Sequence, residues 1–238
     1  GSAYRLLEAT TFIGVSLTGA FSAMYTYLGH DTVPTVSAVF QRSIKLSLIA
    51  LVPTAVAFGV LAEPLCRALF GPGLTAAAEP LRILAPVVVI WGIVSLAVTL
   101  VVSREDPKRL VWVVALAAAA NLGFNLALIP LLDENGAALA MLLSTLVYIL
   151  PAMTIAVRSV RGIQWTAMLA PPLLAGALMA VPMAALDGLL PVALVAGGLV
   201  YLVGYVVLER LISPDDYDFV VAMVKRRLRP GREPAHAP

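Results

Sequence analysis

Arg5 and Glu8 are the first side chains in this chain with the chemistry to bind a substrate, and they lie three residues apart beside an apolar segment. On a helix this spacing brings a guanidinium and a carboxylate to one face, where they can form an interfacial ion pair. The guanidinium fork of Arg5 also matches phosphate oxygens, so it could instead contact a phosphate group of a substrate. The sequence leaves both interpretations open.

Other polar side chains lie inside apolar segments. Thr18, Ser22 and Tyr25 fall in the most polar of these segments, and Asn121 and Asn125 lie one helical turn apart in "NLGFNLALIP". One interpretation places each set on the wall of a hydrated cavity that accommodates a polar substrate. The other makes Thr18 and Ser22 part of a small-residue packing seam, with hydroxyls that bond to carbonyls of their own helix. For the two asparagines it gives interhelical hydrogen bonds, worth about 0.6 kcal/mol per contact in a membrane bundle. Both interpretations predict that the asparagine face avoids lipid.

Arg42 and Lys45 precede the second apolar segment. Long basic side chains in such a position anchor a helix at the membrane surface by snorkelling, and they can also attract an anionic headgroup of the inner leaflet. His30 and His236 are isolated in the sequence, and Cys66 is the single cysteine. No metal site is therefore predicted.

The composition identifies the solvent that surrounds these residues. Hydrophobic residues make up 61% of the 238 residues and charged residues only 13%, and the mean hydropathy is +0.95. Soluble domains carry about 25% charged residues. A chain this poor in charge cannot build an aqueous surface, so the sequence indicates an integral membrane protein.

Seven segments have the length and apolar character of transmembrane helices, which need about 20 residues each. None of the seven has Asp, Glu, Lys or Arg in its interior. The predicted fold class is an all-α integral membrane protein with about seven transmembrane helices, at residues 9–29, 46–62, 83–103, 110–132, 136–157, 165–186 and 188–208.

The basic residues predict the orientation of these helices. With the C-terminus in the cytoplasm, only Arg5, Arg67 and Arg82 lie outside and every other Lys or Arg lies inside. This distribution follows the positive-inside rule. The N-terminal end is then extracytoplasmic, which predicts further helices upstream of residue 1.

A tight turn is predicted between the fourth and fifth segments. Pro130 disfavours continuation of the helix, and Asn135-Gly136 in the acidic stretch that follows favours positive φ. The alanines after this turn allow the next helix to approach its neighbour closely. The predicted result is an antiparallel helical hairpin.

Several motifs along the chain resemble those of a known family. They are "AYRLLEA", "LFGPGLTAAAEPLRILAPV", the charged turn "SREDPKR", "NLGFNLALIP" and "GAALAMLLSTLV". Their order and spacing over residues 1–212 are similar to the C-terminal half of the polysaccharide-exporter branch of the multidrug/oligosaccharidyl-lipid/polysaccharide superfamily. Members of that branch include flippases for lipid-linked oligosaccharides.

The resemblance implies fourteen helices, in two six-helix lobes followed by a final pair. Residues 1–158 would supply five spans of the second lobe without its first helix, and residues 159–210 would supply the final pair. Residues 211–238 would form a cytoplasmic amphipathic helix and a disordered tail. Alternating access would require the N-terminal lobe as well.

The resemblance also implies a function without catalysis. The chain would be part of a flippase that moves a polyprenyl-pyrophosphate-linked oligosaccharide, a polysaccharide or O-antigen precursor, across the cytoplasmic (inner) membrane by alternating access. No catalytic residue, metal or cofactor is expected, and coupling to an ion or to the membrane potential stays open. The expected partners are the bilayer, the lipid-linked glycan, the N-terminal lobe and polysaccharide assembly proteins, but no nucleic acid.

Two other functions stay open from the sequence. A cation-coupled multidrug antiporter of the same superfamily would need carboxylates inside the membrane, and the seven predicted spans lack them. A membrane glycosyltransferase or polymerase would need acidic or basic catalytic groups in a sizeable outer loop. The one outer loop with room, residues 64–80, is dominated by small residues and offers little chemistry.

Overall fold

The structure is a computed structural model that describes residues 33–104 and 108–214. Within these residues every regular element is a helix and none is a strand, which confirms the all-α fold class. The first predicted span, residues 9–29, and the predicted cytoplasmic helix and tail after Pro214 lie outside the described residues. The elements are α2 (Val33–Val60), α3 (Ala62–Phe70), η1 (Pro72–Ala77), α4 (Ala78–Arg104), α5 (Lys108–Arg158), α6 (Trp165–Ala185) and α7 (Leu190–Ile212).

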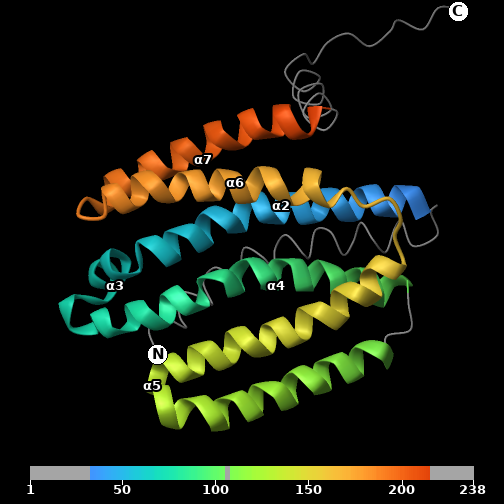
Figure 1. Cartoon of the computed structure of the whole chain (residues 1–238), viewed down its shortest axis with the longest axis horizontal. Coiled ribbons are helices and arrows are strands. Elements are labelled where there is room, and N and C mark those ends of the chain that lie inside the picture. The colour runs from blue at the N-terminus through green and yellow to red at the C-terminus, as the bar shows by residue number, and fades with distance from the viewer. Residues whose placement is uncertain (1–32, 105–107, 215–238) are drawn as a thin grey trace, which may run out of the picture.

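Five of the described helices, α2, α4, α5, α6 and α7, are long and apolar enough to cross a membrane. In α5 the backbone reverses at Asp133, where φ is 49° and ψ is −123°. Residues 108–132 and 134–158 therefore form two legs of a hairpin (Figure 1). Each leg is long enough to cross the hydrocarbon core, so these helices correspond to the last six of the seven predicted spans.

The turn inside α5 differs from its prediction. Positive φ occurs at Asp133 and not at Asn135-Gly136. Gly136 has a different role, because a Cβ at this position would lie 2.2 Å from the carbonyl oxygen of Leu128. The missing side chain of Gly136 allows the two legs to meet backbone to backbone.

The start of α2 also differs from its prediction. The helix begins at Val33, whereas the predicted span begins at residue 46, after the basic residues. Polar residues before that point are accommodated inside the helix. For example, the Ser43 hydroxyl donates to the carbonyl oxygen of Val39 at 2.8 Å, so its hydrogen-bonding capacity is met locally. Lys45 consequently lies well inside a helix rather than at its end.

The long helices lie side by side in the order α7, α6, α2, α4 and α5 (Figure 1). Helix α6 packs against both α7 and α2, while α4 packs against both α2 and α5. Helix α2 is therefore the centre of the described bundle.

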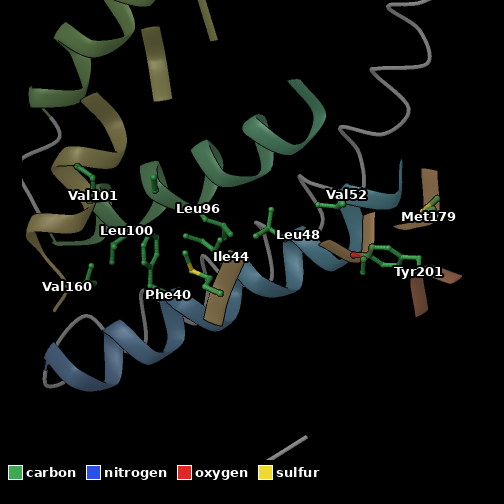
Figure 2. Close-up of a cluster of buried hydrophobic side chains, with 14 of the residues drawn as sticks. Phe40, Ile44, Leu48, Val52, Leu96, Leu100, Val101, Val160, Met179 and Tyr201 are labelled. Carbon is green, nitrogen blue, oxygen red and sulfur yellow. The ribbon is translucent and has the colours of Figure 1, made fainter. Parts of the chain in front are cut away.

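The main hydrophobic core runs along this central helix. Figure 2 shows Phe40, Ile44 and Leu48 of α2 in one buried cluster with Leu96 and Leu100 of α4. The same cluster continues into α6 and α7, through Met179 and Tyr201. By contrast, the outer face of α7 and the first leg of α5 expose many large apolar side chains, as expected for helices that face lipid.

Charged side chains gather at opposite ends of the bundle. At one end α2 and α6 begin and α7 ends, and we call it the basic end. Among the side chains that the structure describes, the charged ones at this end are Arg42, Lys45, Lys108, Arg109, Arg158, Arg161, Glu209 and Arg210. The charged side chains described at the other end, the acidic end, are Glu63, Arg67, Glu79, Arg82, Asp133, Glu134 and Asp187. The uneven distribution of basic residues that the sequence indicates therefore corresponds to two opposite ends of the bundle in the structure.

Candidate functional site

The predicted site residues divide into those outside and those inside the described part of the chain. The outer-end pair and the polar residues of the first span lie outside it: Arg5, Glu8, Thr18, Ser22 and Tyr25. Their contact with substrate stays a prediction. The other predicted residues lie in two separate places, Asn121 and Asn125 in the α5 hairpin and Arg42 and Lys45 at the basic end.

Asn121 and Asn125 form a hydrogen-bonded network between the legs of α5. The Asn121 amide donates to the Ser144 hydroxyl on the opposite leg at 2.9 Å. The Asn125 amide donates to the backbone carbonyl of Asn121 at 2.8 Å and to its side-chain oxygen at 3.0 Å. Both asparagines are partly buried, and their bonds account for the two amides by packing alone. A role on a cavity wall stays a prediction.

Lys45 is buried in the bundle and does not snorkel to the surface. Its side chain is 9% exposed, and its Nζ donates to Oε1 of Glu209 on α7, whose side chain is 7% exposed. The snorkelling interpretation of Lys45 is therefore wrong, because a carboxylate inside the protein pairs with the ammonium. The exposed neighbour Arg42 remains compatible with an anchoring role.

Sequence reasoning missed Glu209, which lies one residue beyond the predicted end of the last span. Its Oε2 is buried and has no hydrogen-bond partner among the described residues. The position of the carboxylate is fixed by packing of α7 against α2, where the Tyr201 hydroxyl donates to the carbonyl oxygen of Ile49 at 3.1 Å. A lone acidic residue at the end of a very apolar segment is the only sequence signal that could have indicated a buried partner for a lysine.

A cavity of about 180 Å³ lies beside Lys45 at the basic end. Its walls come from α2, from the connection between α5 and α6, and from the first turns of α6; the lining residues are Ala38, Gln41, Arg42, Lys45, Gly162, Gln164, Ala167 and Met168. Two hydrogen bonds hold that connection against α2. The Gln164 N–H donates to Oε1 of Gln41 at 2.8 Å, and the Arg161 N–H donates to the Ser37 hydroxyl at 3.0 Å.

The start of α6 contributes positive potential to this cavity. Gln164 precedes the helix and makes no side-chain capping bond. The first N–H groups of a helix have no partner within it, and together they give that end a partial positive charge. Arg42 and Lys45 lie on the facing wall, where the Lys45 ammonium is paired with the Glu209 carboxylate.

A second cavity, of about 330 Å³, lies at the acidic end and is lined by Glu63, Arg67 and Asp187 among others. Arg67 donates to Glu63 at 2.8 Å, and both side chains are well exposed. Such a solvated pair adds little specificity. Within the described residues, no three His, Cys, Asp or Glu side chains come together in a group that could hold a metal ion.

Comparison with known proteins identifies the fold. No family model matches the sequence, and no curated protein matches it. The structure is similar to that of the lipid II flippase MurJ in an inward closed conformation, with a TM-score of 0.70 and 15% sequence identity. The similarity covers 87% of this chain and 47% of MurJ, so the chain spans about half the length of that flippase. The chain is a multi-pass membrane protein with the fold of part of a flippase.

Proposed function

We propose that this chain is one half of a flippase for a polyprenyl-pyrophosphate-linked oligosaccharide of the polysaccharide or O-antigen type. The observation that carries the proposal is the similarity of fold to MurJ over 87% of the chain, because MurJ is a lipid II flippase. The motif resemblance favours a polysaccharide precursor as the cargo. In this proposal residues 1–158 belong to the second lobe, residues 159–210 form the final pair, and residues 211–238 lie in the cytoplasm.

The distribution of exposed apolar side chains supports this arrangement. The apolar outer faces of α5 and α7 leave no route for a glycan through the lipid side of the described bundle. The cargo would therefore move between this half and an N-terminal lobe, with lobe rocking exposing the path to each side in turn. Polar residues of the first span, with Arg5 at its outer end, are the proposed contacts on this half.

Glu209 bears on the competing antiporter function, which requires a carboxylate inside the membrane. The described bundle does bury one carboxylate, contrary to the prediction from the sequence. However, the Lys45 ammonium already occupies the position that a coupling cation would take beside Oε1. The pair is therefore better explained as a structural contact between α2 and α7.

Transport can be tested with the full-length protein reconstituted in liposomes. Replacement of Arg5 by Ala is expected to slow translocation of a pyrophosphate-linked oligosaccharide by about tenfold or more, because a charge-assisted hydrogen bond contributes about 1.5–3 kcal/mol. Arg5→Lys should retain part of the rate, since it keeps the charge but not the guanidinium fork. If Glu8→Gln slows translocation as much as Arg5→Ala does, Arg5 and Glu8 act as a structural ion pair. If Arg5→Ala transports at the normal rate, the proposed contact with phosphate is refuted.

The proposed orientation places the basic end in the cytoplasm, in accordance with the positive-inside rule. Single cysteines that replace Asp133 or Asp187 should then react with a membrane-impermeant maleimide added outside intact cells, whereas a cysteine at Arg161 should not. The native Cys66 gives little background because it is buried, and burial raises the pKa of its thiol. External labelling at position 161 but not at 187 would reverse the orientation.

A further inference from the structure

We propose that the final pair, α6 and α7, is held against α2 and moves with the second lobe as one rigid body during transport. The inference rests on the proposed function, which assigns α2, α4 and α5 to the second lobe. Lobe rocking opens and closes an interface in each cycle. We call the contact of residues 37–56 of α2 with α6, α7 and the connection before α6 the α2 seam. Its contacts are those of an interface that stays closed.

At the basic end, the α2 seam is closed by hydrogen bonds from the connection between α5 and α6. The Arg161 N–H donates to the Ser37 hydroxyl at 3.0 Å, and the Gln164 N–H donates to Oε1 of Gln41 at 2.8 Å. Ser37 and Gln41 are four residues apart, so they lie on one face of α2. The connection therefore follows the surface of α2 and holds the beginning of α6 against it.

The next residue on that face, Lys45, joins α2 to α7. Its ammonium pairs with the Glu209 carboxylate, and the two side chains are only 9% and 7% exposed. Pulling two buried opposite charges apart is costly where water cannot reach them. One turn further along α2, the Tyr201 hydroxyl of α7 donates to the carbonyl oxygen of Ile49 at 3.1 Å. Both contacts would have to break if α7 moved away from α2.

Beyond its polar contacts, the α2 seam is apolar and closely packed. A Cβ on Gly176 of α6 would lie 2.5 Å from Cγ1 of Val52 and 3.4 Å from Cγ2 of Val56. Met179 of α6 and Tyr201 of α7 belong to the same buried cluster as Val52 (Figure 2). Small residues allow helices to approach in this way, and the resulting van der Waals packing is a main attraction between helices in lipid.

The length of the α2 seam makes partial opening costly as well. Its contacts extend from Ser37 to Val56, about 28 Å along the helix axis at about 1.5 Å per residue. The hydrocarbon core of a bilayer is about 30 Å thick, so the seam is closed through nearly the whole membrane. Opening it would break the polar and the apolar contacts together. The interface that opens for the cargo must therefore lie on another side of the second lobe.

The test joins the two sides of the α2 seam covalently in the full-length protein, in a Cys66→Ala background. At the basic end, Gln41→Cys and Gln164→Cys join α2 to the start of α6, because these two residues are in contact. At the acidic end, Ala68→Cys and Gly188→Cys join α3, which follows α2, to the turn between α6 and α7. Both positions line one cavity, and a Cβ at Gly188 meets nothing within 4 Å. A short bifunctional maleimide with a reducible disulfide bridges each pair.

Translocation of the pyrophosphate-linked oligosaccharide is then measured before cross-linking, after it, and after reduction of the bridge. A covalent bridge to an element that must move would slow the cycle, so we expect each cross-linked variant to stay within about twofold of its rate before cross-linking. Single-cysteine variants treated with the same reagent are the matched controls for chemical modification. A larger loss that exceeds the loss in these controls and is reversed by reduction overturns the proposal.

A second measurement separates the rigid body from the proposed cargo. Pairs of spin labels, on cysteines that replace Asp133 and Asp187 or Arg158 and Arg210, report the distance between the second lobe and the final pair at each end of the bundle. All four side chains are exposed. Pulsed EPR in lipid nanodiscs should give one narrow distance for each pair, unchanged by the lipid-linked oligosaccharide or by lipid II. If neither lipid is translocated, the proposed function fails, while unchanged distances still support the rigid body. A second distance for either pair overturns it.

Discussion

Replacement of Lys45 by Met is expected to destabilise the folded protein by about 3–5 kcal/mol, the usual effect of removing one partner from a buried ion pair. The change leaves the Glu209 carboxylate buried without its ammonium, while Oε2 already has no partner among the described residues. Glu209→Met should be similarly damaging, because it removes the carboxylate that pairs with the buried ammonium. Thermal unfolding in a fixed detergent would show both single variants with a markedly lower Tm.

The double variant Lys45→Met, Glu209→Met separates a charge effect from a packing effect. A buried ion pair replaced by apolar residues of similar volume is often neutral or stabilising, so the double variant should recover most of the lost stability. Arg67→Met provides the exposed control: its pair with Glu63 is solvated, and the expected change is about 0.2–1 kcal/mol. If Lys45→Met is no more damaging than Arg67→Met, the buried pair does not hold α2 and α7 together.

Gly136→Ala is expected to destabilise the α5 hairpin by about 3 kcal/mol, at the upper end of the usual cost of overpacking. The added Cβ would lie 2.2 Å from the carbonyl oxygen, 2.6 Å from the carbonyl carbon of Leu128, and 2.9 Å from the backbone nitrogen of Ile129. These are backbone atoms, so no side-chain rotation relieves the overlap and the legs must separate. Such a separation would also strain the bond from Asn121 to Ser144.

Gly123→Ala is the matched control for this prediction because it lies in the same helix, yet a Cβ there meets nothing within 4 Å. Alanine has a higher helix propensity than glycine by about 1 kcal/mol, so this variant should be neutral or more stable. The two variants are compared by their unfolding midpoints in the same detergent. Similar midpoints for Gly136→Ala and Gly123→Ala would contradict the backbone contact between the legs.

The apolar segments and the asymmetric charge allowed most of the fold to be predicted. Length and hydropathy alone locate a transmembrane helix, because a bilayer leaves few alternatives to it. The hairpin at Asp133 was predicted for the same reason, since Pro130 and the acidic turn separate two long apolar runs. What failed was local: positive φ falls on Asp133 and not at Asn135-Gly136, and Gly136 instead lies in close contact with the Leu128 backbone.

The partner of Lys45 could not be predicted from spacing along the chain. Glu209 is 164 positions away, and only the packing order of α7, α6 and α2 brings the two side chains together. The predicted span began at residue 46 and placed Lys45 just outside it, where a lysine at a helix end ordinarily reaches water and needs no partner in the protein. The asparagines show the opposite case, since two amides one turn apart already indicate a neighbouring helix, and Asn121 donates to Ser144 on the opposite leg.

Translocation by the purified full-length protein is the most direct measurement of the proposed function. Liposomes would carry one of three labelled lipids: a polyprenyl-pyrophosphate-linked oligosaccharide, lipid II or phosphatidylglycerol. We predict movement of the first lipid between leaflets well above the protein-free rate, less movement of lipid II, and none of phosphatidylglycerol. Preferential movement of lipid II would change the proposed cargo but leave the proposed flippase activity standing. If folded protein moves neither saccharide-linked lipid, with an ion gradient or a membrane potential applied, the proposed flippase activity is contradicted.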